Sequence, residues 1–179
     1  KDKNDIKLGI KYGVDWIALS FVRSANDIKP LLSIFKKEKK FIPLIAKIEK
    51  PEAIENLDDI IDKFNAILIA RGDLGVEESL AKVPVLQKII IKKCRDAKKP
   101  VIIATQMLES MVKNSTPTRA EVNDVATAVY ESADAVMLSG ETSIGKYPVD
   151  SVNIMKNIII ETEKETLKGK SNFNKSDEL

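Results

Sequence analysis

The sequence predicts an α/β fold made of five consecutive strand–helix units with parallel strands. Five nearly continuous apolar runs begin near residues 15, 42, 66, 101 and 135, at intervals of 24 to 35 residues. Such intervals leave room for a helix between successive strands, and parallel strands need a crossover of this kind. Runs without polar interruption are typical of strands that are buried on both faces of a parallel sheet.

Each predicted element follows from a local pattern. Apolar residues at the spacing i, i+3, i+4, i+7 predict a helix after each strand, and residues 1–13 predict a weaker one before the first strand. Ser24 or Asn26 can cap the first of the five helices, and Thr118 with Glu121 forms a capping box for the fourth. The predicted strands are 16–22, 42–48, 66–70, 101–105 and 135–139, and the predicted helices cover 28–35, 54–64, 86–94, 122–129 and 149–159.

Polar residues at the strand ends decide between an open doubly wound sheet and part of an eight-stranded barrel. They are Ser20 and Arg23, Lys47 and Glu49, Arg71 and Asp73, Thr105 and Gln106, and Ser139 and Glu141. A barrel brings all strand ends to one mouth, where barrel enzymes place their chemistry. An open sheet would carry a glycine-rich first loop, and the sequence has no G-x-G-x-x-G. We therefore expect a partial TIM (β/α)8 barrel, although five units cannot close one.

The apolar pattern stops near residue 163, where Lys, Asn, Ser, Asp and Gly take over. Segments of this composition bury too little apolar surface to pack firmly. We expect residues 1–165 to form the partial barrel domain and residues 166–179 to be a linker or tail.

Composition narrows the chemistry. The 179-residue chain has a formal net charge of +2, no histidine and one cysteine, Cys94. So small a charge gives no reason to expect nucleic-acid or membrane binding. Histidine-based triads, Cys/His zinc sites and disulfides are excluded. The groups that remain are lysine, carboxylates, hydroxyls, backbone amides and a hard cation held by oxygen.

The expected compartment is the cytoplasm. A lone cysteine in an apolar helical run suits a reducing environment. We see no secretory leader and no apolar run of about eighteen residues that would span a membrane.

Lys47 and Glu49 are candidate site residues because they point to the same side of an otherwise apolar strand. Charges on such a strand are costly unless they meet each other, a metal or a substrate. Glu49 and Asp73 suit Mg²⁺, and Lys47 suits the stabilisation of charge on a phosphoryl group or an enolate. The alternatives are a plain Glu49–Lys47 ion pair, a helix-capping Asp73 and a lysine that reaches the surface.

The turn at Ala70–Asp73 and the hydroxyl of Thr105 are further candidates. The backbone amides of Gly72 and Asp73 before a helix suit a carboxylate or phosphate, and glycine lets a ligand approach closely. A β-turn without a ligand is the alternative. Thr105 suits a hydrogen bond to a substrate or a proton relay, and its alternative role is a plain N-cap for the segment that starts at Gln106.

Six segments form an ordered set: Ala18–Arg23, Ala46–Glu49, Ala70–Gly75, Ile103–Ser110, Pro117–Glu121 and Met137–Thr142. In this order and spacing they closely resemble the pyruvate kinase family, from the first residues to about Glu165. One segment alone would be a weak signal, but six in register are highly specific.

The resemblance implies a (β/α)8 barrel of which this chain supplies the last five strands. It implies transfer of a phosphoryl group from phosphoenolpyruvate to ADP, giving pyruvate and ATP in glycolysis. By motif, Lys47 would stabilise the transferring phosphoryl group, and Glu49 and Asp73 would hold an essential Mg²⁺ or Mn²⁺. The amides of Gly72 and Asp73 would take the substrate carboxylate. Thr105 would contact the substrate near its reacting carbon, so Lys47 and Thr105 are the expected catalytic residues.

The resemblance also implies parts that this sequence does not contain. These are three earlier strands, an inserted lid domain and a C-terminal regulatory domain, and the K⁺ ligands and nucleotide contacts belong to the earlier segments. The family implies a homotetramer for the full-length protein. We expect little or no kinase activity from the 179-residue chain alone, since a half-barrel leaves the edges of its first and last strands unpaired.

Two other functions stay open. A metal-dependent aldolase or lyase acting on pyruvate or oxaloacetate would also hold Mg²⁺ with a Glu and an Asp, but it would need neither Lys47 nor ADP. A non-catalytic half-barrel that serves binding or assembly is the second. Such a module would have no use for Lys47, Glu49 and Asp73 together, because buried charges burden a scaffold.

Overall fold

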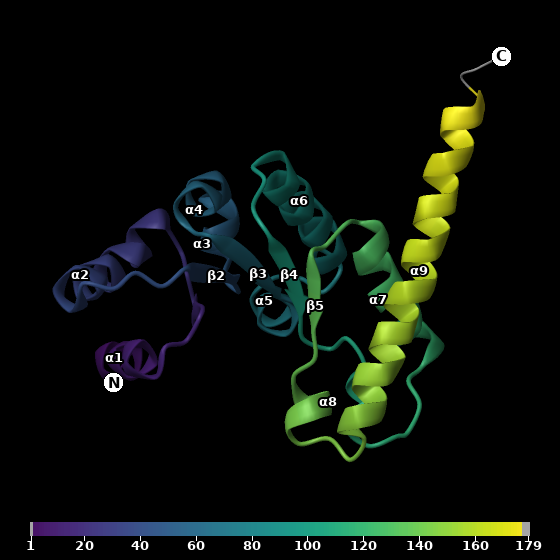
Figure 1. Ribbon diagram of the computed structural model, residues 1–179, viewed down its shortest axis with the longest axis horizontal. Coiled ribbons are helices and arrows are strands. Elements are labelled where there is room, and N and C mark those ends of the chain that lie inside the picture. The colour runs from purple at the N-terminus through teal and green to yellow at the C-terminus, as the bar shows by residue number, and fades with distance from the viewer. Residues whose placement is uncertain (1, 177–179) are drawn as a thin grey trace. The chain divides into compact units, whose positions relative to one another are not determined.

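The computed structural model describes the backbone of residues 2–176 and the side chains from residue 3 to residue 166. The chain divides into two compact units, Lys1–Ile102 and Ile103–Leu179, and strands alternate with helices in both (Figure 1). The strands follow one another in chain order, β1-β2-β3-β4-β5. This order confirms the predicted succession of strand–helix units of a partial barrel, in which each crossover places the next strand beside the last.

The first unit holds the strands β1 (Ile17–Leu19), β2 (Leu44–Ile48) and β3 (Ala66–Ala70). They are parallel, and Lys47 pairs with Leu68 and Ile48 with Ile69. Because this register aligns the carboxyl ends of β2 and β3, the residues that follow them leave the sheet at the same edge. The helices of this unit are α1 (Asp2–Tyr12), the 3₁₀ helix η1 (Ala25–Ile28), α2 (Lys29–Glu38), α3 (Pro51–Glu55), α4 (Leu57–Lys63), α5 (Arg71–Glu77) and α6 (Val83–Asp96).

Strand β4 (Val101–Ala104) passes from the first unit into the second, which also holds β5 (Ala135–Met137). Its helices are the 3₁₀ helix η2 (Glu109–Val112), α7 (Arg119–Tyr130), α8 (Gly140–Ser143) and α9 (Pro148–Ser176). Helices α7 and α9 pack side by side (Figure 1). Helix α9 continues through the predicted tail as far as Ser176, and residues 177–179 lie outside the described part. The domain boundary at 165 stays a prediction.

Burial differs among the strands, so the expectation that all five are buried on both faces was wrong. Every residue of β3 is buried, and β2 alternates between buried and half-buried positions. Strands β1 and β5 keep exposed residues, Ala18 in the first and Ala135 and Met137 in the second. These two are the first and last strands of the sheet, and an edge strand has a neighbouring strand on one side only.

The core of the first unit lies where β3 meets α4 and α6. Ile60, Phe64, Ile67, Ile69 and Ile90 are fully buried there. Burying one such side chain stabilises a fold by about 1.5–3 kcal/mol.

The ends of the helices explain where they begin and break. Ser24, rather than Asn26, caps η1 through a capping box with Asp27, and the predicted capping box of Thr118 and Glu121 is confirmed at the start of α7. The predicted helix 54–64 is broken at Asn56. The side-chain amide of Asn56 donates to the carbonyl oxygens of Glu52 (2.9 Å) and Arg23 (3.0 Å), so it ends α3 and holds the chain against the η1 segment.

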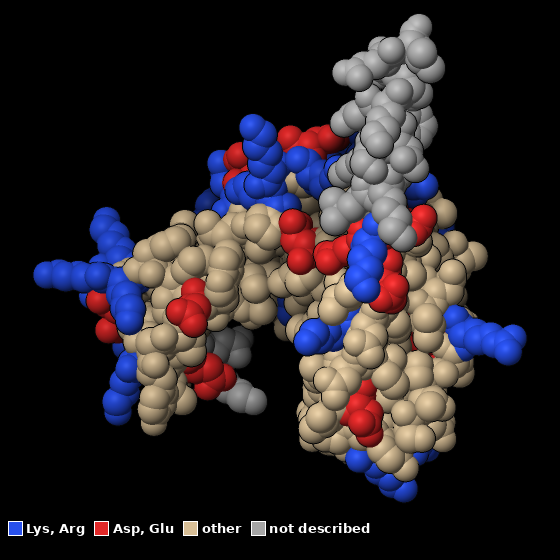
Figure 2. Space-filling view, turned by 45° about the vertical axis from the view of Figure 1, so that its right-hand side comes forward, with Lys and Arg blue, Asp and Glu red and all other residues tan. Residues whose placement is uncertain are grey.

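Charged side chains are mixed over the surface. On the face drawn in Figure 2 the described basic side chains form several separate groups, with acidic ones among them. Several are in ion pairs, such as Lys7 with Glu38 and Lys92 with Asp96. Among the described residues, no helix combines the length and the apolar character that a bilayer span requires.

Candidate functional site

The centre of the candidate site is the pair Lys47 and Glu49 at the carboxyl end of β2. The Lys47 Nζ lies 2.6 Å from the Glu49 Oε1, which confirms that the two side chains share one face of the strand. The Glu49 side chain is 1% exposed and that of Lys47 is 25% exposed. A buried carboxylate therefore has its counter-ion beside it, and the lysine still reaches the surface.

The segment after β1 supplies two further contacts to this pair. The Lys47 Nζ donates to the Ser20 Oγ (3.1 Å), and the backbone N–H of Phe21 donates to the Glu49 Oε2 (2.7 Å). Phe21 has a φ of 57°, which is uncommon for a bulky side chain. This left-handed backbone accompanies an N–H that faces Glu49, so one carboxylate oxygen accepts a hydrogen bond from Phe21 and the other forms the ion pair with Lys47.

Gly72 and Asp73 lie in the first turn of α5, which starts directly after β3. The helix expected after this turn is therefore present, and the choice between a ligand site and a turn without a ligand stays open. Asp73 is exposed, and acidic side chains in a first turn complement the partial positive charge of a helix N-terminus. Because β2 and β3 end at the same edge of the sheet, Glu49 and the first turn of α5 leave that edge side by side.

Thr105 follows β4 in the second unit, and its backbone is strained. Its φ is 70° and that of Gln106 is 54°, whereas β-branched residues rarely adopt positive φ. The Thr105 hydroxyl donates to the carbonyl of Ala104 (2.6 Å). The next helix is η2, which begins at Glu109 with Leu108 as its cap, so the alternative of Thr105 as a plain N-cap was wrong.

Glu141 connects the segments that follow β4 and β5. Its side chain is buried, its Oε1 accepts from the backbone N–H of Leu108 (3.0 Å), and its Oε2 accepts from that of Ser139 (2.8 Å). One carboxylate thus holds the loop that carries Thr105 and the loop that carries Ser139.

A second hydrogen-bond network, partly buried, lies at the start of α7. The carboxylate of Glu121 accepts from the N–H and hydroxyl groups of both Ser110 and Thr118. Burial alone would raise the pKa of Glu121, but these hydrogen bonds outweigh it and hold the pKa below its ordinary value of 4.5.

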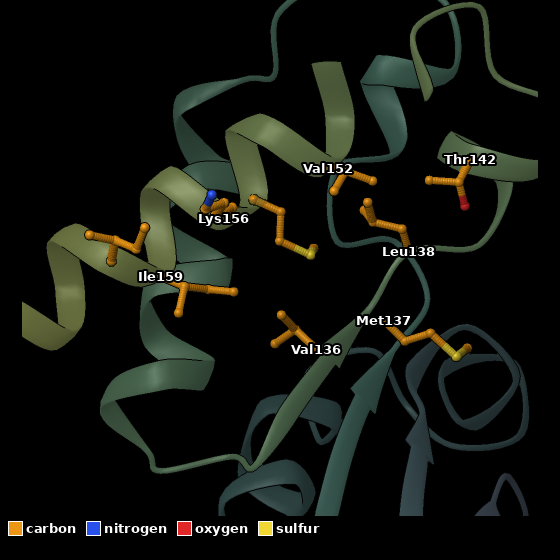
Figure 3. A pocket seen from close by; sticks show the side chains of 9 residues that line it. Val136, Met137, Leu138, Thr142, Val152, Lys156 and Ile159 are labelled. Atoms are coloured by element: carbon orange, nitrogen blue, oxygen red, sulfur yellow. The ribbon is translucent and has the colours of Figure 1, made fainter. Parts of the chain in front are cut away.

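An apolar pocket of about 510 Å³ lies in the second unit between β5, α8 and α9 (Figure 3). Val136 and Leu138 face Val152 and Ile159 across it. Its lining residues are Val136, Met137, Leu138, Thr142, Val152, Met155, Lys156, Ile159 and Ile160. No predicted site residue is among them.

Sequence reasoning missed the contacts of Phe21 and Lys50 in the first unit and of Glu141 in the second. Glu141 was noted as a polar strand end whose segment, 139–142, had the same two possible roles as Thr105, but its contact with the loop at Leu108 was not foreseen. Phe21 acts through its backbone N–H, which no residue type signals. Lys50 contacts Glu77 and the ring of Phe21, and its position directly after Glu49 was the available signal.

Strand–helix units in chain order, with a lysine and two carboxylates at the ends of neighbouring strands, define a domain of the (β/α)8 barrel class. Residues 1–152 match the family model described as pyruvate kinase, barrel domain. The chain therefore belongs to the pyruvate kinase family.

Curated relatives agree with the family model. The chain is 53% identical over 163 residues to a pyruvate kinase of Mycobacterium intracellulare. The aligned region covers 91% of this chain and 34% of the relative. It is 55% identical over 159 residues to one of Corynebacterium efficiens, covering 89% and 34%. It is 51% identical over 163 residues to one of Dictyostelium discoideum, covering 91% and 32%. The chain thus spans about a third of the length of these relatives.

Proposed function

We propose that this chain is part of the catalytic barrel of an enzyme that transfers the phosphoryl group of phosphoenolpyruvate to ADP, giving pyruvate and ATP in glycolysis. The observation that carries the proposal is the Lys47–Glu49 pair at the exit of β2, beside the turn that bears Asp73. Relatives that are named pyruvate kinase and exceed half identity over about nine-tenths of the chain support it.

In the proposed reaction the bond between phosphorus and the enol oxygen of phosphoenolpyruvate breaks, and phosphorus bonds to a terminal oxygen of ADP. The electron pair left on the enol oxygen gives an enolate, which takes one proton at carbon to become pyruvate. We assign Lys47 to compensate the negative charge on the transferring group, because positioning and electrostatics carry most of the catalysis of phosphoryl transfer. We assign Thr105 to contact the substrate near the carbon that is protonated.

The first turn of α5 suits the carboxylate of the substrate. A helix N-terminus carries partial positive charge and presents backbone amides. We assign the amides of Gly72 and Asp73 to this contact, which would hold the substrate at the end of β3 and beside Lys47.

Glu49 and Asp73 fit Mg²⁺ or Mn²⁺ by their donor chemistry. Both are carboxylates at the exits of adjacent strands, and the Glu49 oxygen that accepts the N–H of Phe21 retains a lone pair. No group of three or more potential metal-ligating side chains forms in the described part of the chain. Mg²⁺ commonly takes one or two carboxylates and completes its shell with water and substrate oxygens. When bound, the cation would neutralise negative charge on the substrate oxygens.

Family membership supports three further proposals. K⁺ acts as a second cation through ligands that lie outside this sequence. The full-length protein assembles as a homotetramer, and it acts in the cytoplasm. The 179 residues alone have little or no activity, since they span about a third of the length of their relatives.

The test measures pyruvate formation from phosphoenolpyruvate and ADP with Mg²⁺ and K⁺, in the chain with its natural flanking sequence. Lys47→Met should lower kcat by at least about 100-fold, the loss typical of removing one charge-stabilising group. Lys63→Met is the matched control, because Lys63 pairs with Asp62 on the surface. Pyruvate release without ADP, from oxaloacetate or an aldol substrate, would replace the proposal with the aldolase. Absence of turnover and of Mn²⁺ binding would favour the binding module.

A further inference from the structure

Lys50 makes two contacts that the proposed reaction does not use. Its side chain is 19% exposed, its Nζ lies 2.5 Å from the Glu77 Oε1, and the same nitrogen lies 5.6 Å from the centre of the Phe21 ring. Phe21 follows β1, Lys50 follows β2, and Glu77 is the last residue of α5, which follows β3. One ammonium therefore connects the segments that leave all three strands of the first unit.

The contact of Lys50 with Phe21 affects Glu49, because Phe21 donates a hydrogen bond to that carboxylate. An ammonium over an aromatic face is attracted by the negative charge of the ring face. Held there, Phe21 keeps the left-handed backbone whose N–H donates to the Glu49 Oε2 at 2.7 Å. The ring and the N–H belong to one residue, so an ammonium that holds the ring also restrains the backbone that carries the donor to Glu49.

The ion pair of Lys50 with Glu77 affects Asp73, because Glu77 and Asp73 belong to the same helix, α5. The two residues are four positions apart on α5, so they lie on the same face of that helix. The ion pair of Glu77 with Lys50 restrains the rotation of α5 about its axis. It therefore sets the direction in which the exposed side chain of Asp73 points.

We propose that Lys50 is a positioning residue for the two metal ligands. It orients Glu49 through Phe21 and orients the first turn of α5, with Asp73, through Glu77. This inference rests on the proposed function, which assigns Glu49 and Asp73 to Mg²⁺ or Mn²⁺. Lys50 itself contacts neither the cation nor the substrate.

The test measures Mn²⁺ affinity from the electron paramagnetic resonance signal of free Mn²⁺, in the chain with its natural flanking sequence. Lys50→Met should raise the Kd for Mn²⁺ by about tenfold, the loss typical of removing a partner of a metal ligand. Glu77→Gln should do the same. Lys50→Arg keeps the charge and both contacts, so it should bind Mn²⁺ like the parent, as should the surface control Lys63→Met.

Two results would overturn the inference. One is a parent-like Kd in Lys50→Met, even with a lower midpoint of thermal unfolding, since a purely structural lysine would affect stability alone. The other is a parent-like Kd for Mn²⁺ in Glu77→Gln. This second variant decides the matter if Lys50→Met does not fold. Turnover of phosphoenolpyruvate is measured in the same preparations. A parent without turnover removes the proposed function, whereas an active parent with unchanged Kd values in both variants removes only the positioning role.

Discussion

The ammonium of Lys47 lies 2.6 Å from the carboxylate of Glu49, so the two charges at the end of β2 neutralise each other inside the fold. Glu49 is fixed by its burial and by the N–H of Phe21, while Lys47 remains a quarter exposed. The pair thus combines a fixed anion with a cation that can still meet a ligand.

Loss of Lys47 alone should destabilise the protein more than loss of both charges. In Lys47→Met the carboxylate of Glu49 stays buried without its counter-ion, which we expect to cost about 1–3 kcal/mol. The double variant Lys47→Met with Glu49→Gln should recover part of that cost, because no charge is left buried. The measurement is the midpoint of thermal unfolding of the three proteins. A double variant less stable than the single one would contradict this account of the pair.

Loss of the Glu49 charge should weaken metal binding without unfolding the protein. Gln has the shape of Glu and can still accept the N–H of Phe21, but it is a poor ligand for a hard cation. We expect Glu49→Gln to raise the Kd for Mn²⁺ by more than about tenfold, since even the loss of an outer partner costs that much. Glu38→Gln, at an ion pair on α2, is the control. Equal Kd values for the two variants would exclude Glu49 as a ligand.

Glu121 should give the protein a pH-dependent stability. Its pKa is below 4.5 in the folded protein, so the unfolded chain takes up the proton first as the pH falls. The stability from this group is therefore complete above about pH 4.5 and is lost as the pH falls through the folded pKa. The unfolding midpoint of the parent should exceed that of Glu121→Gln by a constant amount above pH 4.5 and by less below it. Ser110→Ala should reduce the same slope, and a difference independent of pH would contradict the assignment.

We expect Thr105 to lower the stability of the protein through its strained backbone and to raise kcat through its hydroxyl. Glycine adopts a φ of 70° without strain, so Thr105→Gly should be at least as stable as the parent, with relief of about 1 kcal/mol or more. Its kcat should fall, because the hydroxyl is gone. Thr127→Gly, in the interior of α7, is the control and should be destabilised by a few tenths of a kcal/mol, about the difference in helix propensity between Thr and Gly. Equal destabilisation by both substitutions would show that Thr105 is unstrained.

Glu141 should support turnover although it lies away from Lys47 in the sequence. Glu141→Ala leaves the backbone N–H groups of Leu108 and Ser139 without their acceptor, each at a cost of about 1–3 kcal/mol. We expect a lower unfolding midpoint and a lower kcat, because the loop that bears Thr105 loses its support. Glu141→Gln, with one carbonyl oxygen, should fall between Glu141→Ala and the parent. A parent-like kcat in Glu141→Ala would contradict this role.

Patterns of short range predicted much of this fold and site. Alternation along β2 placed Lys47 and Glu49 on one face, and the succession of strand ends placed Asp73 at the same edge as that pair. The capping box at Thr118 needed only a three-residue spacing. What escaped prediction depends on contacts between distant segments, such as the hydrogen bond from Phe21 to Glu49, 28 positions apart, and that from Leu108 to Glu141, 33 positions apart. The break at Asn56 likewise depends on a side chain that reaches back to Arg23.

The pairing of Lys47 with Leu68 also determines where this chain can change its length. Deletion of one residue within β2 would turn every later side chain of the strand to the opposite face, so Lys47 would point away from the substrate side. An added residue at 79–82, an exposed stretch between α5 and α6, would only lengthen a surface turn. Insertions and deletions that preserve the activity should therefore accumulate in turns such as 79–82 and be absent from β2 and β3.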